Sequence, residues 1–237
     1  MDWNSVLYGQ LPYVIITIAV VGTIARYVTN AYSWSSQSSQ FLENKVLFFG
    51  SFPWHFGIVL VLLAHIFAIF FPSAILSWNA VPFRLYALEV TGLILGLLAL
   101  FGLIMFVYRR LTDSRVRAVT STADVLVIII LLVQVISGVA TAIYFNWGSN
   151  WFAASAVPWI WSIITFSPDV AFIAGLPLLA KIHIFNAMLF ILLIPFSRFV
   201  HFLAIVGPIQ YVFGRPYQLV RWYGPRGART EPIRQYK

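Results

Sequence analysis

The four histidines of this chain all lie inside long apolar stretches, and they occur as two pairs on two stretches. The first stretch contains His55 and His65, and the second contains His183 and His201. An imidazole is costly in hydrocarbon unless something binds it, so a histidine within a membrane segment indicates a functional site. The chain has no cysteine, which excludes cysteine-ligated iron–sulfur clusters and covalently attached c-type haem. Two imidazole pairs therefore predict two iron porphyrins, each held between helices.

Other uses of these histidines stay open on residue types alone. Each imidazole can simply hydrogen-bond a neighbouring helix, and a set of them can relay protons. A copper or zinc site requires ligands that converge at one depth, whereas these histidines are expected at two depths, without acidic or sulfur ligands beside them. Bis-histidine haem b is favoured, because two neutral imidazoles fill both axial positions of an iron that then changes oxidation state with little rearrangement.

The composition indicates a membrane protein. Hydrophobic residues make up 61% of the 237 residues and charged residues only 9%, against about 25% charged residues in a typical soluble domain. The length fits one domain and leaves no room for a soluble catalytic module beside the membrane segments. We therefore expect a single transmembrane domain over residues 1–237, with a basic cytoplasmic tail at about residues 207–237.

Five apolar stretches are long enough to cross a bilayer as helices, which takes about 17–25 residues. They are residues 11–28, 47–71, 87–108, 123–145 and 176–206. The last is longer than one crossing needs, and Pro195 is a candidate for a kink within it. The predicted fold class is all-α, an integral membrane bundle of five transmembrane helices.

The longest connector, residues 146–175, is rich in tryptophan. Its tryptophans are Trp147, Trp151, Trp159 and Trp161. This composition is typical of an aromatic belt at the membrane interface. The alternative is a loop that packs its tryptophans on helix ends, and the two are compatible.

The positions of the basic residues predict the orientation of the chain. The connector before the fourth stretch and the tail after the fifth contain most of them, namely Arg109, Arg110, Arg115, Arg117, Arg215, Arg221, Arg226, Arg229, Arg234 and Lys237. The connector after the second stretch has Arg84 alone, and residues 146–175 have no Lys or Arg. By the positive-inside rule, the N-terminus is expected outside and the C-terminus in the cytoplasm. The net charge of +8 is attributed to this topology and not to nucleic-acid binding.

This topology makes the second and fifth stretches antiparallel. Histidines at like depth then pair, which places His65 with His183 in the outer half and His55 with His201 in the inner half. At about 100° per residue, the step from His183 to His201 returns to the same face of a helix, and the step from His55 to His65 leaves them roughly 80° apart. The corresponding rises, about 27 Å and about 15 Å, do not match, so the pairing requires helix tilt or a bend at Pro195.

The residues that flank the histidines resemble the gamma subunit of respiratory nitrate reductase, a membrane cytochrome b. The supporting segments are residues 34–40 (WSSQSSQ), 108–124 (YRRLTDSRVRAVTSTAD), 181–183 (KIH), 195–201 (PFSRFVH) and 217–221 (YQLVR). The histidine spacings and the plan of five spans match as well, and the resemblance covers nearly the whole chain. The longer basic tail, residues 222–237, departs from the family pattern.

The resemblance implies that His55, His65, His183 and His201 are the axial ligands of two haem b groups. It also implies a quinol-oxidising site beside the outer haem, with electrons passing inward to an iron–sulfur beta subunit and then to a molybdenum alpha subunit that reduces nitrate. The expected location is the prokaryotic inner membrane, with quinol, lipid and these two cytoplasmic subunits as partners. The basic tail is expected to order on a partner subunit or on anionic lipid.

Candidate residues for the outer site are Arg84, Lys181 and Glu89. Arg84 is a candidate to hydrogen-bond the quinol oxygen, as a similarly placed basic residue of the family does; the alternative is an ordinary interfacial arginine. Lys181 is a candidate for the quinol site or for an outer haem propionate, or it only extends its ammonium to the interface. Glu89 is a candidate proton acceptor, although an acid near a helix start also has a simpler electrostatic role.

Candidate residues for the inner site are Arg109, Arg110, Ser39 and Ser38. Arg109 and Arg110 are expected to border the inner haem, and one of them is a candidate partner of its propionates, since a guanidinium fork suits a carboxylate. The alternative is that Arg110 only follows the positive-inside rule. Ser39 and Ser38 are candidates of the same kind as Arg110.

Two other functions stay open. The first is a related cytochrome b that serves another redox module, of formate, sulfur or heterodisulfide type. The second, from a different class, is a cofactor-free transporter or scaffold whose histidines relay protons. A Soret band in the purified protein separates the cytochromes from the transporter, and association with a molybdenum subunit separates the two cytochromes.

Overall fold

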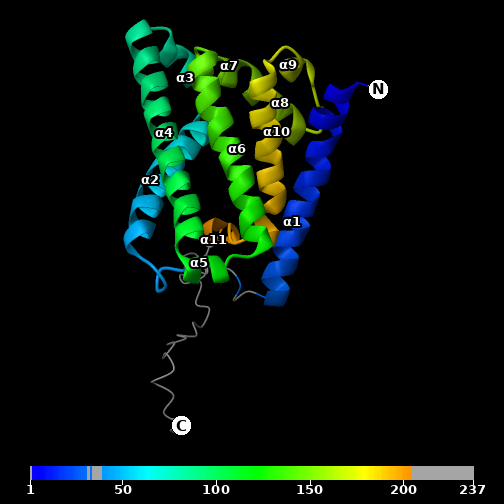
Figure 1. The fold of residues 1–237 in the computed structure, drawn as a ribbon. Coiled ribbons are helices and arrows are strands. Elements are labelled where there is room, and N and C mark those ends of the chain that lie inside the picture. The colour runs from blue at the N-terminus through cyan, green and yellow to red at the C-terminus, as the bar shows by residue number, and fades with distance from the viewer. Residues whose placement is uncertain (1, 31–32, 34–38, 204–237) are drawn as a thin grey trace, which may run out of the picture. The chain divides into compact units, whose positions relative to one another are not determined.

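The computed structural model describes residues 2–30, 33 and 39–203, and within these ranges the chain is helical, with no β-strand. Five helical segments are long and apolar enough to cross a membrane: Ser5–Asn30, Lys45–Phe70, Pro82–Thr112, Thr122–Tyr144 and Leu178–Phe196. Figure 1 shows that they alternate in direction. The expected all-α bundle of five membrane-crossing helices is confirmed. The predicted basic tail at about 207–237 lies outside the described residues.

Each crossing is built on one long helix, and two of these helices are extended by a short helical segment of different pitch, one before α1 and one after α10. The long helices are α1 (Leu11–Asn30, preceded by the π-helical η1, Ser5–Gln10), α2 (Lys45–Phe70), α4 (Pro82–Thr112), α6 (Thr122–Tyr144) and α10 (Leu178–Leu193, followed by the 3-10 turn η4, Ile194–Phe196). The short connecting elements are α3 (Pro72–Asn79), α5 (Ser114–Ala118), α7 (Gly148–Trp151), η3 (Phe152–Ala156), α8 (Val157–Ile164), α9 (Ala171–Ala174) and α11 (Val200–Leu203). We call the end of the bundle at Ser5 the N-terminal end, and the end at α5 the basic end (Figure 1).

The long helices pack in the order α2, α4, α6, α10, α1, and the tightest contact is between α2 and α4. A Cβ atom at Gly102 of α4 would lie 2.5 Å from the Trp54 nitrogen and 2.7 Å from the Gly50 oxygen of α2. A Cβ atom at Gly57 of α2 would lie 2.6 Å from the Leu95 oxygen. Because lipid tails are as apolar as the side chains, close backbone approach of this kind is what holds helices together in a membrane. The α2–α4 pair therefore fixes the position of two of the four histidines.

Local capping sets where the helices at the basic end begin. Asp113 accepts hydrogen bonds from the backbone N–H groups of Arg115 and Val116, which starts α5. A hydrogen bond from the Arg115 side chain, together with these N–H groups, lowers the pKa of Asp113 to about 2. Ser121 and Asp124 form a capping box at the start of α6, a reciprocal pair of hydrogen bonds that satisfies two free N–H groups.

The fifth apolar stretch departs from its prediction. It was expected as one helix over residues 176–206, but α10 ends at Leu193 and the chain passes through η4 to Ser197, which is extended at φ −125° and ψ 178°. A new helix, α11, begins at Val200 and lies across the bundle near its basic end (Figure 1). The cause is Pro195, which has no N–H to donate and whose ring clashes with the preceding turn. The predicted interruption at Pro195 is confirmed, whereas the assumption of one helical face shared by His183 and His201 was wrong, because the two histidines lie on separate helices.

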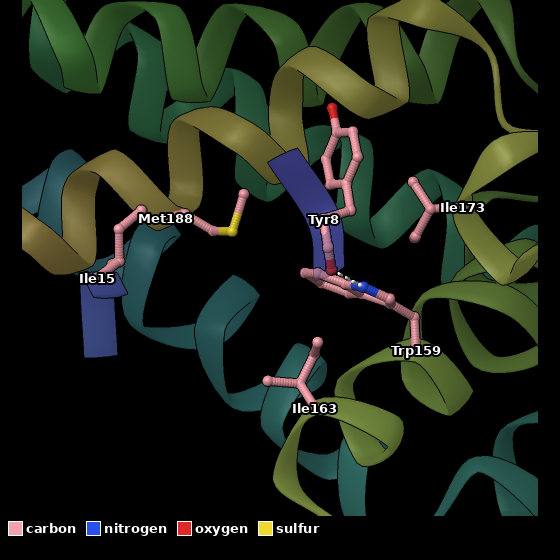
Figure 2. Close-up of a cluster of buried hydrophobic side chains, with 6 residues drawn as sticks. All are labelled: Tyr8, Ile15, Trp159, Ile163, Ile173 and Met188. Carbon is pink, nitrogen blue, oxygen red and sulfur yellow. Dashed lines mark hydrogen bonds between the residues drawn. The ribbon is translucent and has the colours of Figure 1, made fainter. Parts of the chain in front are cut away.

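The tryptophan-rich connector is largely helical, because α7, η3 and α8 follow one another without interruption. Trp159 is buried with Tyr8, Ile15, Ile163, Ile173 and Met188, and its indole N–H donates to the Tyr8 carbonyl at 2.8 Å (Figure 2). Trp147 and Trp161 stay partly exposed. The connector therefore packs one tryptophan in the core, as one of the two interpretations predicts, and an aromatic belt at the membrane interface stays a prediction.

The close approach of α2 and α4 predicts a sharp difference between two glycines of the same helix. Gly102→Ala should destabilise the protein by about 1–3 kcal/mol, the usual cost of overpacking, because its Cβ meets backbone atoms that cannot move aside. Gly92→Ala is the matched control, since nothing lies within 4 Å of its Cβ position and alanine favours helix. Thermal unfolding in detergent measures both; equal melting temperatures for the two variants would contradict the packing described.

Candidate functional site

The histidines occupy two levels of the bundle. His65 lies five residues before the end of α2, and His183 lies five residues after the start of α10. Both ends are at the N-terminal end of the bundle (Figure 1), so the two imidazoles lie at the same depth, about 8 Å along their helices. They are also within range of a direct electrostatic interaction. His65 and His183 therefore lie at the same end of the bundle, and their pairing as ligands of one haem stays a prediction.

The break in the fifth crossing also reconciles the depths of the histidines. His183 lies 10 residues before Leu193, where α10 ends, which is about 15 Å of helix. His55 lies 10 residues before His65 on α2, again about 15 Å. A straight helix would continue from Leu193 to His201 along the bundle axis. Because α11 runs across the bundle after the break, this further rise along the axis is not imposed on His201. The break therefore removes the straight rise of about 27 Å that made the depths differ, and the pairing of His55 with His201 stays a prediction.

The Nδ1 atom of every histidine is hydrogen-bonded to a backbone carbonyl oxygen. The pairs are His55 with Ser51 at 2.7 Å, His65 with Val61 at 2.8 Å, His183 with Gln134 at 3.0 Å, and His201 with Arg198 at 2.8 Å. A carbonyl oxygen only accepts, so each neutral imidazole carries its proton on Nδ1 and its lone pair on Nε2. Histidines that ligate metals show this arrangement. The donor set therefore fits axial coordination through Nε2.

A polar network on α6 surrounds His183. Ser137 Oγ lies 3.1 Å from Nδ1, and the side-chain amide of Gln134 donates to Nε2 at 3.2 Å. Asn186, one turn after His183 on α10, donates to the Gln134 side-chain oxygen at 2.8 Å. Gly138 makes room for the ring, because a Cβ there would lie 2.9 Å from the His183 Cε1 atom.

The sequence analysis missed these positioning residues. The signal that was available is their spacing: Gln134, Ser137 and Gly138 lie at i, i+3 and i+4, which is one face of a helix. Polar and small residues on one face of an otherwise apolar span indicate the side that meets another helix.

The His55 side chain lines a groove on the surface of α2. The groove has a volume of about 970 Å³, and its lining includes Gln40, Lys45, Ser51, Phe52 and His55. This volume lies in the range of cofactor sites, about 300–1,000 Å³. An imidazole that faces an apolar groove of this size suits a large flat ligand. Near the N-terminal end, His65 instead meets Phe152, with ring centroids 4.8 Å apart and an interplanar angle of 72°.

Arginine and serine candidates at the basic end have defined partners. Arg109, only 2% exposed, forms an ion pair with Glu43 at 2.7 Å and donates to the Ser39 hydroxyl at 2.8 Å. Burial raises the pKa of the Glu43 carboxyl, whereas hydrogen bonds from the N–H groups of Val46 and Leu47 and from the Arg109 guanidinium lower it. The net effect is a lowered pKa. The Ser39 hydroxyl thus supports Arg109, and Ser38 lies outside the described residues.

Arg110, also a candidate at the basic end, has a side-chain N–H group without a partner among the described residues. Its Nη1 donates to the Phe106 carbonyl at 3.3 Å, while its Nε is buried without a hydrogen-bond partner in the described part of the chain. Asp124, Arg109 and Arg198 are its charged neighbours.

Arg84 and Lys181 lie at the N-terminal end but on different elements. Arg84 donates to the Ser77 carbonyl at 3.3 Å, and its guanidinium lies 5.3 Å from the centre of the Trp78 ring. Its Nε is buried without a partner among the described residues. Lys181 donates to the Ala174 carbonyl of α9 at 2.8 Å. The structure does not bring these two candidates into contact within its described ranges.

Arg26 of α1 holds the break in the fifth crossing, and the sequence analysis did not identify it. Its Nη1 donates to the carbonyls of Pro195 and Ser197 at 2.8 and 2.7 Å. Carbonyls at a helix end lack partners within the helix, so this guanidinium replaces the hydrogen bonds that the break removes. Gly22, one turn earlier on α1, lets Pro195 approach, since a Cβ there would lie 3.1 Å from the proline ring.

These observations define an all-helical, multi-pass membrane protein whose four histidines each have Nδ1 hydrogen-bonded to a backbone carbonyl. Among the described residues, no group of three or more His, Cys, Asp or Glu side chains is placed to hold a bare metal ion. The family model described as the nitrate reductase gamma subunit matches residues 4–223. The chain belongs to this family, and it is a membrane subunit of the nitrate reductase type.

Three bacterial relatives extend over nearly the whole chain. The nitrate reductase gamma chain of Bacillus subtilis (strain 168) is 34% identical over 213 residues, which cover 88% of this chain and 94% of that protein. The respiratory nitrate reductase 2 gamma chain of Escherichia coli (strain K12) is 32% identical, covering 92% and 96%. The respiratory nitrate reductase 1 gamma chain of the same strain is 30% identical, covering 92% and 97%.

Removing the Arg26 guanidinium should loosen the break that it holds. Hydrogen bonds to charged groups contribute about 1.5–3 kcal/mol each, so Arg26→Met should speed amide hydrogen exchange in residues 194–203 by about tenfold or more. Mass-spectrometric exchange in detergent measures this. Thr29→Val is the control, because the Thr29 hydroxyl bonds only within its own helix, to Ala25. Unchanged exchange in Arg26→Met would show that the break holds without the clamp.

Proposed function

We propose that this chain is the di-haem b, quinol-oxidising membrane subunit of a respiratory nitrate reductase. It would accept electrons from quinol, pass them to an iron–sulfur beta subunit and a molybdenum alpha subunit, and anchor both. The single observation that carries this proposal is the set of four imidazoles at two levels, each with its Nδ1 bonded to a carbonyl. Family membership supports the partner subunits.

The proposed ligand pairs are His65 with His183 and His55 with His201. Haem b, when bound, supplies an iron that takes up and releases one electron at a time. The protein's part is to hold each Nε2 lone pair towards the iron, and the carbonyl bonds do this by fixing the tautomer and the ring orientation. Ser137 adds a second constraint at Nδ1 of His183. The Gln134 amide donates to Nε2 of the same ring and would have to leave that lone pair for the iron when haem binds.

The proposed orientation places the N-terminus outside and the basic end in the cytoplasm. Arg109, Arg110, Arg115, Arg117 and Arg198 support it, because they gather at or near the basic end, whereas the N-terminal end has Arg84 and Lys181. Short connectors rich in Arg and Lys stay on the cytoplasmic side. The beta and alpha subunits would then bind at the basic end.

The proposed quinol site lies beside His65 and His183. Arg84 is the proposed hydrogen-bond donor to a quinol oxygen, and its unpartnered Nε supports this role. Lys181 is proposed to border the same site and to keep α9 in place through the Ala174 carbonyl. At the inner level, Arg110 is the proposed partner of a haem propionate, again through a buried Nε, and Ser39 contributes by holding Arg109.

Four histidine variants test the pairing. His65→Ala or His183→Ala should each remove the same haem, near the N-terminal end, and abolish quinol oxidation. His55→Ala or His201→Ala should each remove the other haem, while quinol still reduces the one that remains. The measurement is haem content per chain together with reduced-minus-oxidised spectra of the purified complex. If His55→Ala and His183→Ala removed the same haem, the pairing would be wrong, and a colourless wild-type complex would overturn the function itself.

The terminal acceptor is tested by isolating the protein with its partners. The wild-type chain should co-purify with a molybdenum-containing subunit, and the complex should reduce nitrate with quinol as donor. Oxidation of formate with quinone as acceptor, or reduction of sulfur or a heterodisulfide in place of nitrate, would assign the chain to another redox module.

A further inference from the structure

A hydrogen-bonded chain of polar side chains at the N-terminal end takes no part in holding the histidines. Glu89 of α4 accepts hydrogen bonds from the backbone N–H of Ser149 at 2.8 Å and from its hydroxyl at 2.6 Å. Asn79, at the end of α3, donates to the Ser149 hydroxyl at 2.9 Å and to the Asn150 side chain at 2.7 Å. Three separate elements, α3, α7 and α4, are thus joined through Asn79, Ser149 and Glu89.

Unpartnered polar atoms concentrate at this end of the bundle. In the described part of the chain, four buried side-chain atoms lack a hydrogen-bond partner, and three of them are Asn79 Oδ1, Arg84 Nε and Trp151 Nε1. Asn79 is only 6% exposed. Buried polar groups in native proteins are nearly always hydrogen-bonded, to ordered water where the protein offers no partner. Three such atoms in one region therefore point to bound water.

Gly148 lies between two of the polar groups of this region. Its Cβ position lies 3.5 Å from Glu89 Oε2 and 3.8 Å from Trp151 Nε1, so a carboxylate oxygen and an indole N–H face the same small volume. Both hydrogen bonds from Ser149 go to the other carboxylate oxygen, Oε1. Glu89 Oε2 is therefore the atom placed to take a hydrogen bond, or a proton, from a water molecule.

The same helical segment joins this cluster to the level of the outer histidine pair. Phe152, which packs against the His65 ring, lies three residues after Ser149. One helical turn therefore separates a contact with the proposed outer ligand from a contact with Glu89. A proton released beside His65 would have this carboxylate as a nearby acceptor.

We propose that Glu89 accepts the protons of quinol oxidation and that Asn79, Ser149 and the associated water carry them to the N-terminal surface. The inference rests on the proposed function. Oxidation breaks both O–H bonds of the quinol and yields one quinone, two electrons and two protons. Haem b held by His65 would be the acceptor of the two electrons, and each proton would pass to the Glu89 carboxylate and then to solvent.

The charged and titratable surroundings of Glu89 are sparse. α3, α7 and η3 contain no ionisable side chain. On the other described elements packed against this part of α4, the ionisable groups are His65 of α2 and Tyr144 at the end of α6, and α4 itself adds Arg84 and Tyr86. Glu89 is the only carboxylate among them, which singles it out as the acceptor.

The test is Glu89→Gln in the complete enzyme complex, with duroquinol as the electron donor. Glutamine keeps an oxygen for the Ser149 hydrogen bonds but cannot take up a proton. We expect quinol oxidation to slow by about 100-fold, with a rate that rises with pH as solvent replaces the carboxylate. Haem content, spectra and potentials should stay as in the wild type, and Glu89→Asp should recover part of the rate.

Asp169→Asn is the matched control, because this exposed carboxylate lies between α8 and α9 and accepts from the Ala171 N–H; its rate and pH profile should be those of the wild type. A Glu89→Gln complex with wild-type rate and pH profile would overturn the inference. Dithionite-driven nitrate reduction separates the two levels of failure. If the Glu89→Gln complex oxidises quinol at the wild-type rate, contains both haems and reduces nitrate normally with dithionite, the role of Glu89 is refuted and the proposed function stands. If the wild-type complex lacks haem, the proposed function itself fails.

Discussion

In hydrocarbon, each backbone and side-chain polar group must find its partner inside the protein, because no water is there to supply one. This requirement explains the features that set the histidines in place. Every imidazole gives its Nδ1 proton to a carbonyl, and the carbonyls freed by the break at Pro195 are taken up by Arg26. Arg109, which is almost fully buried, is surrounded by Glu43 and Ser39. The geometry of the candidate sites is thus a consequence of satisfying polar groups in an apolar solvent.

The break in the fifth crossing shows how this requirement shapes the bundle. A proline within a helix removes one hydrogen bond and displaces the preceding turn, and in a membrane the lost partners must be replaced. Here the replacement comes from another helix, since Arg26 lies on α1. The result is a redirected chain that places His201 on α11, across the bundle, instead of further along α10. The Arg26 guanidinium on the first crossing therefore helps to set the position of His201, which follows the fifth crossing.

The two ends of the bundle differ in chemistry. Charge at the basic end is paired, as in Arg109 with Glu43 and Arg198 with Asp124, which suits a rigid surface beside partner subunits. The N-terminal end has a carboxylate, Glu89, in a hydrogen-bonded chain beside buried polar atoms that lack a partner among the described residues. This difference between the two ends is consistent with the proposed release of protons at one end and the proposed transfer of electrons to partner subunits at the other.

Much of this protein follows from local sequence. Five apolar stretches, the absence of cysteine and the spacing of four histidines are enough to predict an all-α bundle with paired imidazoles. His55, His65 and His201 bond carbonyls three or four residues earlier in the chain, so their orientation is also set locally. His183 differs: its Nδ1 partner is the carbonyl of Gln134 on α6, reachable because Gly138 has no side chain. That contact, the Arg26 clamp and the Glu89–Ser149 bond join residues far apart in sequence. Only the packed bundle decides them, because spacing along a helix specifies which face a residue occupies but not which helix will meet that face.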